Sequence, residues 1–217
     1  MSKRREDAQQ SITSILDAAE YLMVHEGYAS VSTRRVAAVA GVKPPLVHYY
    51  YKTTDALLLA LYDRTAEQTQ QRLNQALSSD RPLHALWKLN IDPSRTVLSV
   101  EFIALCNHRK TVRKEVARRV EIFRRQQVEA LNAALGATGS LSARAAPVVL
   151  AGVARALIME QGLGVSLGHK EAALFMEALI AKAELSAPPR ERASTGAAAK
   201  SRQAKKQTAK RARTDRS

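Results

Sequence analysis

Residues 32–51 read STRRVAAVAGVKPPLVHYYY and predict two short helices separated by a glycine turn. Ser32 or Thr33 can cap the first helix, because a hydroxyl oxygen accepts a hydrogen bond from a free N–H group at a helix start. Gly41 adopts the positive φ that ends a helix at little cost. The double proline that begins at Pro44 suits the first turn of a second helix, where an N–H group has no intrahelical partner. We therefore expect a helix, a tight turn and a second helix.

The second helix is expected to have one packed face and one free face. Val47 and Tyr51 are four residues apart and share a face, which we assign to packing. The other side chains of this helix point elsewhere. Two helices joined by a short glycine turn form a helix-turn-helix, whose second helix reads the major groove of DNA with residues near its N-terminus. The pattern therefore predicts a DNA-reading element.

Further motifs occur around this element in a set order. They are an amphipathic helix that ends in HEGY at residues 25–28, TRRVA from Thr33, AGV at 40–42, an aromatic cluster, and TTDALLLALYDR at 53–64. By these motifs, residues 11–62 resemble the DNA-binding domain of the tetracycline-repressor (TetR/AcrR) family. Three positions depart from the family's pattern. This chain has Lys43 where the family usually has a small capping residue, His48 where it has a tyrosine, and Thr54 where it has a lysine.

The residues expected to contact DNA lie in or beside the helix-turn-helix. They are Thr33, Arg34, Lys43, Pro44, Pro45, Leu46, His48, Tyr49, Tyr50, Lys52 and Thr54. Arg34 and Lys52 suit phosphate oxygens, whereas Lys43 can reach a guanine edge or a phosphate. The prolines and Leu46 can pack on thymine methyl groups, although the prolines can equally serve only to start the helix. The histidine and the two tyrosines offer donors to phosphates, but at least one of them can instead pack between helices.

Charge is concentrated at the C-terminal end of the chain. Residues 186–217 contain 10 Lys and Arg but 2 Asp and Glu, so more than half of the net charge of +14 lies there. A basic balance favours polyanions such as nucleic acid. This segment is poor in large apolar residues, so we expect a disordered tail that either binds DNA without sequence preference or only aids solubility. Residues 1–10 are expected to form a flexible basic arm.

Periodicity predicts an all-α fold. Apolar residues recur at helical spacing in residues 11–26, 55–77, 82–91, 94–108, 111–135, 145–163 and 169–185. We expect a three-helix DNA-binding domain with a helix-turn-helix at 11–52 and a helical ligand-binding and dimerisation domain at 53–185. Residues 145–163 are apolar almost all round, so this helix needs cover on two sides. In the TetR/AcrR family the last two long helices form the dimer interface; the alternative is that they belong to a monomer core.

The second domain offers a few polar and aromatic groups for a small-molecule effector. The candidates are Trp87, Asn90, Glu101, Cys106, Phe123 and Glu160. No glycine-rich phosphate loop, Cys/His metal spacing or nucleophile motif is present in the sequence, so neither an enzyme nor a metal or other cofactor is expected. The single cysteine cannot form an intrachain disulfide, and there is no apolar run long enough to span a bilayer. We therefore expect a cytoplasmic protein without a membrane partner.

These observations predict a transcription regulator. As the resemblance implies, it would be a repressor that binds a palindromic double-stranded DNA operator as a homodimer and is released by an unknown small molecule. The first alternative is a nucleoid-type protein that uses the basic tail to bind DNA without an operator. It predicts equal affinity for random and cognate duplexes at matched salt. The second is an α-helical enzyme, whose turnover would not depend on Arg34 or Lys43.

Overall fold

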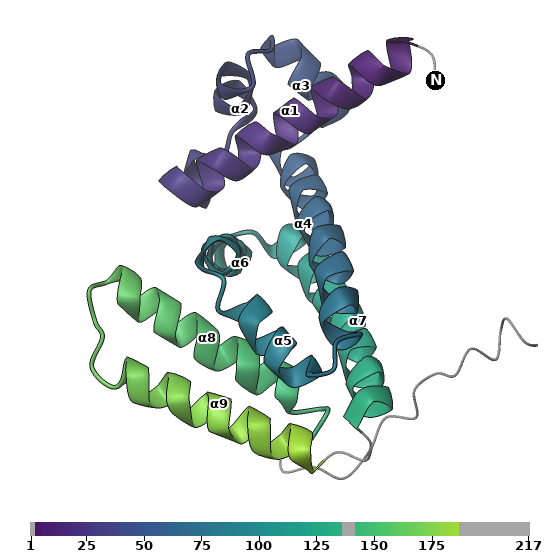
Figure 1. Ribbon diagram of the computed structural model, residues 1–217. Coiled ribbons are helices and arrows are strands. Elements are labelled where there is room, and N and C mark those ends of the chain that lie inside the picture. Colours follow the sequence, from purple (N-terminus) through teal and green to yellow (C-terminus); the bar gives the residue numbers. More distant parts are fainter. Residues whose placement is uncertain (1–2, 136–141, 187–217) are drawn as a thin grey trace, which may run out of the picture. The chain divides into compact units, whose positions relative to one another are not determined.

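The computed structural model describes residues 3–135 and 142–186, which all belong to one compact unit, Met1–Ala187 (Figure 1). The basic tail predicted at 186–217 lies outside the described residues apart from Ser186. The described residues contain helices and turns but no strand, which confirms the predicted all-α fold. The elements are α1 (Lys3–Glu26), the short 3-10 helix η1 (Tyr28–Ser30), α2 (Thr33–Val39), α3 (Pro44–Tyr50), α4 (Thr54–Leu77), α5 (Pro82–Asn90), α6 (Pro93–His108), α7 (Lys110–Leu135), α8 (Ala146–Gly162) and α9 (His169–Leu185).

The first helix starts earlier than the sequence pattern predicts. Residues 3–10, expected as a flexible arm, form the opening turns of α1. They continue the backbone hydrogen bonding of the amphipathic segment, and the Ser11 hydroxyl donates to the Asp7 carbonyl oxygen at 2.9 Å. These turns are largely exposed, so they extend from the core without adding to it.

The helix boundaries in the DNA-binding segment follow the predicted local signals. The Ser32 hydroxyl accepts from the Arg35 N–H group at 3.3 Å and caps α2, and the Thr53 hydroxyl accepts from the Ala56 N–H group at 3.0 Å and caps α4. Gly41 has a φ of 67°, which is the left-handed conformation expected at the turn. These local signals set the start of each helix and the turn between α2 and α3.

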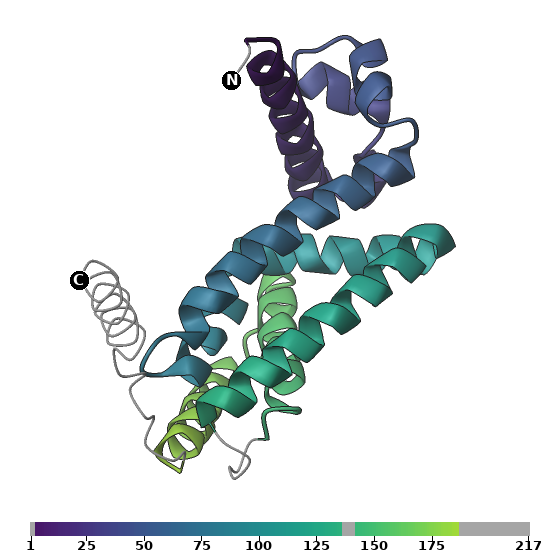
Figure 2. The ribbon, with the colours of Figure 1, turned by 90° about the vertical axis from the view of Figure 1, so that its right-hand side faces the viewer.

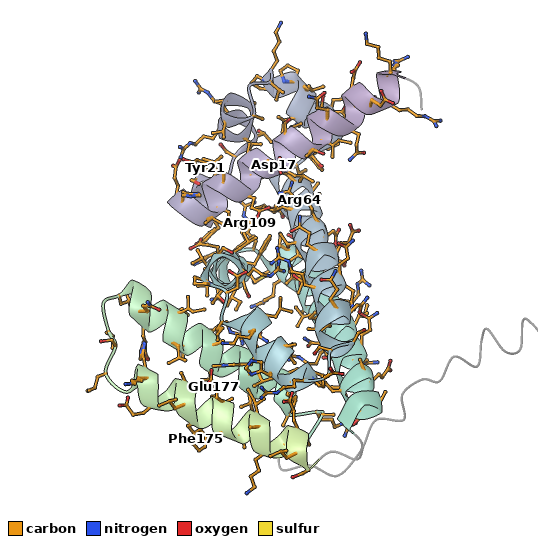
Figure 3. The ribbon with its side chains drawn as sticks, in the orientation of Figure 1. Asp17, Tyr21, Arg64, Arg109, Phe175 and Glu177 are labelled. Carbon is orange, nitrogen blue, oxygen red and sulfur yellow. The ribbon has the colours of Figure 1, made fainter. Side chains whose placement is uncertain are left out.

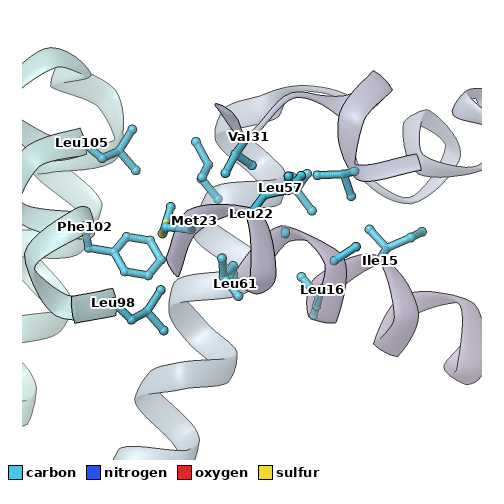
Figure 4. Close-up of a cluster of buried hydrophobic side chains, with 14 of the residues drawn as sticks. Ile15, Leu16, Leu22, Met23, Val31, Leu57, Leu61, Leu98, Phe102 and Leu105 are labelled. Carbon is cyan, nitrogen blue, oxygen red and sulfur yellow. The ribbon is translucent and has the colours of Figure 1, made fainter. Parts of the chain in front are cut away.

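One hydrophobic core joins the N-terminal helices to α4, α6 and the start of α7 (Figure 4). From α1 it takes Ile15, Leu16, Ala18, Ala19, Leu22 and Met23; from α4, Leu57, Leu58 and Leu61; and from α6, Leu98, Phe102 and Leu105. Because α6 belongs to the second predicted domain, burial of its apolar face fixes the DNA-binding helices to that domain.

A second core lies among α4, α5, α7, α8 and α9. It contains Leu73, Leu83, Leu86, Trp87, Leu131, Leu150, Ala154, Met176 and Ile180. The long helix α4 contributes to both cores, with Leu61 in the first and Leu73 in the second. Figure 2 shows this helix running from the N-terminal helices to the helices of the second core. The same helix is therefore part of both cores.

Candidate nucleic-acid interface and effector cavity

The helix α3 is held by one face. Val47 is fully buried and packs in the first core with Val36 and Ala37 of α2. The Val42 N–H group donates to the Ala37 carbonyl oxygen at 3.0 Å, which closes the turn between the two helices. Tyr51 ends α3 and packs, half-buried, against the same core, as the sequence predicts. The opposite face of α3 is left free.

The free face carries most of the side chains predicted to contact DNA. Lys43, Pro44, Pro45, His48 and Tyr49 are exposed, and Tyr49 retains 69% of its accessible surface. Leu46 is half-buried at the edge of this face. A helix that is anchored by one valine and free over its N-terminal turn has the form needed to enter a DNA groove.

The three residues that offered donors to phosphates, His48, Tyr49 and Tyr50, do not share one environment. Tyr50 is half-buried and packs against the first core, whereas His48 and Tyr49 are exposed. Tyr50 is therefore the one of the three that packs between helices. Its ring meets the Tyr49 ring edge-on at 5.1 Å between centroids. The Lys52 ammonium lies 5.7 Å from the centroid of the Tyr49 ring, a cation–π arrangement that places a cation over the face of this exposed ring.

The remaining predicted contacts flank the helix-turn-helix. Arg34 is exposed on α2 and forms no ion pair within residues 3–135 and 142–186, whereas its neighbour Arg35 pairs with Glu26 at 2.7 Å. Thr33 and Thr54 are half-buried at the first positions of α2 and α4. Of the two adjacent arginines, Arg34 is thus the one available to a phosphate.

An arginine of α4 links the DNA-binding helices to the second domain. Arg64 donates to Asp17 of α1 at 2.5 Å and also to Glu20 one turn further on (Figure 3). Its side chain is 19% exposed, so the ion pairs are partly shielded from water. Both acids lie on α1, so the two ion pairs tie α1 to α4 at this level.

A second link runs from α6 to the segment before the helix-turn-helix. The Tyr28 N–H group donates to the Glu101 carboxylate at 2.7 Å. The Tyr28 ring stacks on the His108 ring of α6, with 5.7 Å between centroids. A carboxylate that accepts from a half-buried backbone N–H group makes a charge-assisted hydrogen bond, which is stronger than a neutral one.

A third link joins the start of α4 to the boundary of α6 and α7. The Asp55 carboxylate accepts from the Thr111 hydroxyl at 2.7 Å and from the Arg109 guanidinium at 2.5 Å. The Thr111 hydrogen bond, followed by that from Arg109, lowers the pKa of Asp55 below its ordinary value. Thus two carboxylate-based contacts connect the N-terminal segment with α4 and α6, and a third fixes α4 to the boundary of α6 and α7.

A cavity of about 880 Å³ lies among α1, α4, α5, α6, α7 and α8. Its apolar wall includes Leu86, Leu98, Phe102 and Phe123. Its polar wall contains six arginines, which are Arg64, Arg72, Arg95, Arg119, Arg124 and Arg155. Cavities of a few hundred to about 1,000 Å³ with mainly apolar walls and a few polar groups are typical of small-molecule sites.

Three of the six residues predicted to bind an effector lie on this cavity, namely Asn90, Cys106 and Phe123. The other three have different environments. Trp87 is buried in the second core, Glu101 bonds to the Tyr28 N–H group, and Glu160 pairs with His169 at 2.8 Å. Burial raises the pKa of the Cys106 thiol, which disfavours the reactive thiolate.

The sequence-based reasoning missed the arginines on the cavity wall. Gln127 was the available signal, because it is a polar residue within the apolar stripe of the helix at 111–135. In the structure Gln127 is buried on the cavity wall, and its Oε1 atom has no hydrogen-bond partner within the described part of the chain. A buried polar group without a partner points to a ligand or solvent that completes its hydrogen bonding.

The two C-terminal helices leave apolar side chains exposed. On α8, Val148 and Met159 are exposed, as is Leu163, which directly follows the helix, and a Cβ at Gly152 would meet nothing within 4 Å. On α9, Leu174, Phe175 and Leu185 are exposed, while Met176, Ile180 and Ala183 of the same helix are buried. Each of these two helices therefore leaves several large apolar side chains in contact with solvent in the single chain.

Among the helices that the structure describes, none is both long and apolar enough to span a bilayer. Residues 3–135 and 142–186 contain no group of three His, Cys, Asp or Glu side chains placed to hold a metal ion.

Residues 15–61 match a family described as bacterial regulatory proteins, tetR family. No curated protein matches the chain. Several solved structures resemble it over most of its length.

A TetR-family transcriptional regulator from Rhodococcus sp. is 18% identical, with a TM-score of 0.65 over 81% of this chain and 99% of its own. A transcriptional regulator from Pseudomonas aeruginosa PAO1 is 20% identical, with a TM-score of 0.62 over 82% of this chain and 91% of its own. NalD, the secondary repressor of the MexAB-OprM multidrug efflux pump in Pseudomonas aeruginosa, is 19% identical, with a TM-score of 0.54 over 81% and 96%. These likenesses show a common fold.

Proposed function

We propose that this chain, which belongs to the tetR family of bacterial regulatory proteins, is a repressor that binds a palindromic operator as a homodimer and releases it when a small molecule enters the cavity. The proposal has three parts, which are DNA reading by α3, dimerisation through α8 and α9, and coupling of the cavity to the DNA-binding helices. Each part is supported by a different set of residues.

The single observation that carries the proposal is the free face of α3. Lys43 and the following prolines stand exposed on its first turn, while Val47 holds the helix to the core from behind. Residues on the first turn of such a helix contact base edges in the major groove. Arg34 and Lys52 lie on either side of this helix and suit the phosphates that flank the groove.

Dimerisation is supported by the exposed apolar side chains of α8 and α9. Leu163 keeps 80% and Phe175 keeps 67% of its surface in the single chain. Burial of large apolar side chains is favourable by roughly 1.5–3 kcal/mol each. A two-fold dimer would cover them and would also provide the two reading heads that a palindromic site requires, with half-sites about 34–36 Å apart.

Coupling is supported by the residues that lie on the cavity and also contact the DNA-binding helices. Arg64 lines the cavity and pairs with Asp17 and Glu20 of α1. Phe102 lines it as well and belongs to the first core, one residue from Glu101. A ligand that favours a different position of α4 or α6 would change the spacing of the two α3 helices and weaken operator binding.

The first test is a footprint of the full chain on the DNA that flanks its own gene. We expect a protected site with two-fold symmetry, and much weaker binding to a random duplex of equal length at the same salt concentration. Lys43→Ala and Arg34→Ala should weaken binding, and loss of a phosphate contact should reduce the slope of log affinity against log salt by about 1. Arg125→Ala, which removes an exposed charge on α7, is the matched control.

Two results would contradict the proposal. Equal affinity for the flanking DNA and the random duplex would favour a non-specific DNA-binding protein. Binding that is unchanged by Lys43→Ala and Arg34→Ala would remove the helix-turn-helix from the DNA interface. Circular dichroism of each variant shows whether the fold is retained.

A further inference from the structure

Two of the cavity arginines have side chains without any hydrogen-bond or ion-pair partner among the described residues. Arg64, Arg72 and Arg119 each form an ion pair with an Asp or Glu, and Arg95 donates to the Thr69 hydroxyl. Arg124 of α7 and Arg155 of α8, in contrast, form neither a hydrogen bond nor an ion pair with any described residue. Glu121, three residues before Arg124, is itself paired with the exposed Arg125 at 3.3 Å, and Glu160, five residues after Arg155, is paired with His169 at 2.8 Å.

The two unpaired guanidinium groups act on each other. Burial lowers the pKa of Arg124, and the positive charge of Arg155 lowers it further, while Glu121 acts in the opposite direction. Two like charges that line the same cavity repel each other, and partial burial reduces the screening by water. An anion placed between them would remove this repulsion and could accept hydrogen bonds from both planar groups.

The surroundings of the arginine pair indicate what the rest of the ligand is like. Gln127 lies one helical turn from Arg124 on α7, is 7% exposed, and has a buried Oε1 atom that accepts no hydrogen bond in the described structure. Phe123 lines the cavity beside them, and Phe102 and Leu86 line it from α6 and α5. The site thus combines two cations, one free acceptor and an apolar wall.

We propose that the cavity binds an amphipathic oxyanion, whose carboxylate or phosphate lies between Arg124 and Arg155 and whose apolar body packs against Phe102 and Phe123. A hydroxyl or amide N–H group on the ligand would donate to the Oε1 atom of Gln127. The inference rests on the proposed function only in taking this cavity as the effector site; it adds the chemical class of the effector.

Calorimetric titration of the full chain with four ten-carbon probes tests this inference. The probes are decanoate, decyl phosphate, decan-1-ol and decylammonium, each kept below its aggregation concentration. They share an apolar body and differ in the charge of the head group. We expect at least one of the two anions to bind about tenfold or more tightly than the alcohol, and the cation to bind most weakly. Comparison of the two anions shows whether the site prefers a carboxylate or a phosphate.

Amino-acid substitutions show which positive charges are responsible for the affinity for anions. Arg124→Gln combined with Arg155→Gln should reduce the affinity for the anions to that for decan-1-ol, and Arg155→Lys should retain part of it. Arg125→Gln is the matched control, because Arg125 lies next to Arg124 on α7 but its side chain is 73% exposed and does not line the cavity. Circular dichroism checks that all variants are folded.

Three results would overturn the inference. They are the absence of binding by both anions, equal binding of the alcohol and the anions, and full anion affinity in the double variant. Failure of the proposed function is a separate result. An anion that binds through the two arginines yet leaves operator affinity unchanged would contradict release by that ligand and leave the oxyanion site in place.

Discussion

The contact between Glu101 and the Tyr28 N–H group gives a quantitative test of how α6 holds the DNA-binding helices. The two groups lie 2.7 Å apart and the N–H group is half-buried. A hydrogen bond to a charged group contributes about 1.5–3 kcal/mol, and a neutral one contributes about 0.5–1.5 kcal/mol. Glu101→Gln keeps a hydrogen-bond acceptor without the charge, so it should lower the free energy of unfolding by about 1 kcal/mol. Glu101→Ala removes the acceptor and should lower the free energy of unfolding by about 2 kcal/mol.

Amide hydrogen exchange at Tyr28 measures this contact locally, and urea unfolding measures it globally. A loss of about 2 kcal/mol corresponds to exchange that is roughly 30-fold faster at the Tyr28 amide, since each 1.4 kcal/mol is a factor of ten. Glu67→Ala, which removes an exposed acid from α4, is the control and should change neither measurement. The reasoning is refuted if Glu101→Ala exchanges as slowly as the unmodified chain, or if glutamine costs as much as alanine.

Three further perturbations follow from packing and charge. Leu61→Ala should lower the free energy of unfolding by about 2–5 kcal/mol, because Leu61 is fully buried in the first core; a loss below 1 kcal/mol in urea unfolding would contradict that placement. Asp55 has a lowered pKa, so its contribution to stability is present above the ordinary value of 3.8 and is lost as the pH falls below it. Asp55→Asn should therefore flatten the decline of the unfolding free energy in that range, and an unchanged pH profile would show that the contact is not formed. Phe175→Glu places a charge on the exposed face of α9 and should shift the chain toward a monomer in analytical ultracentrifugation, whereas an unchanged dimer would exclude this face from the interface.

The helix-turn-helix could be predicted because its signals are local. The hydroxyl caps at Ser32 and Thr53, the positive φ of Gly41 and the position of Val47 each follow from a residue and its near neighbours. The start of α1 was placed too late because its first turns bury little apolar surface, so periodicity gave no signal there. A solvent-exposed extension of a helix leaves almost no pattern in a sequence.

The cavity could be predicted only in part, because its chemistry depends on residues far apart in the chain. Arg64 pairs with acids 44 and 47 positions away, and Glu101 meets a backbone N–H group 73 positions away. Helix periodicity places each of these residues on a helix but does not say which helices meet. The polar position of Gln127 in an apolar stripe was the one local signal for the cavity wall.

Selection of bound duplexes from a randomised pool tests most directly whether α3 reads base edges. The unmodified chain is predicted to select two inverted half-sites whose centres are about 10–10.5 base pairs apart. Lys43→Ala and Pro45→Ala are predicted to change the base preferred at the same position of both half-sites. Selection of no preferred sequence, or a preference that both substitutions leave unchanged, would contradict the account.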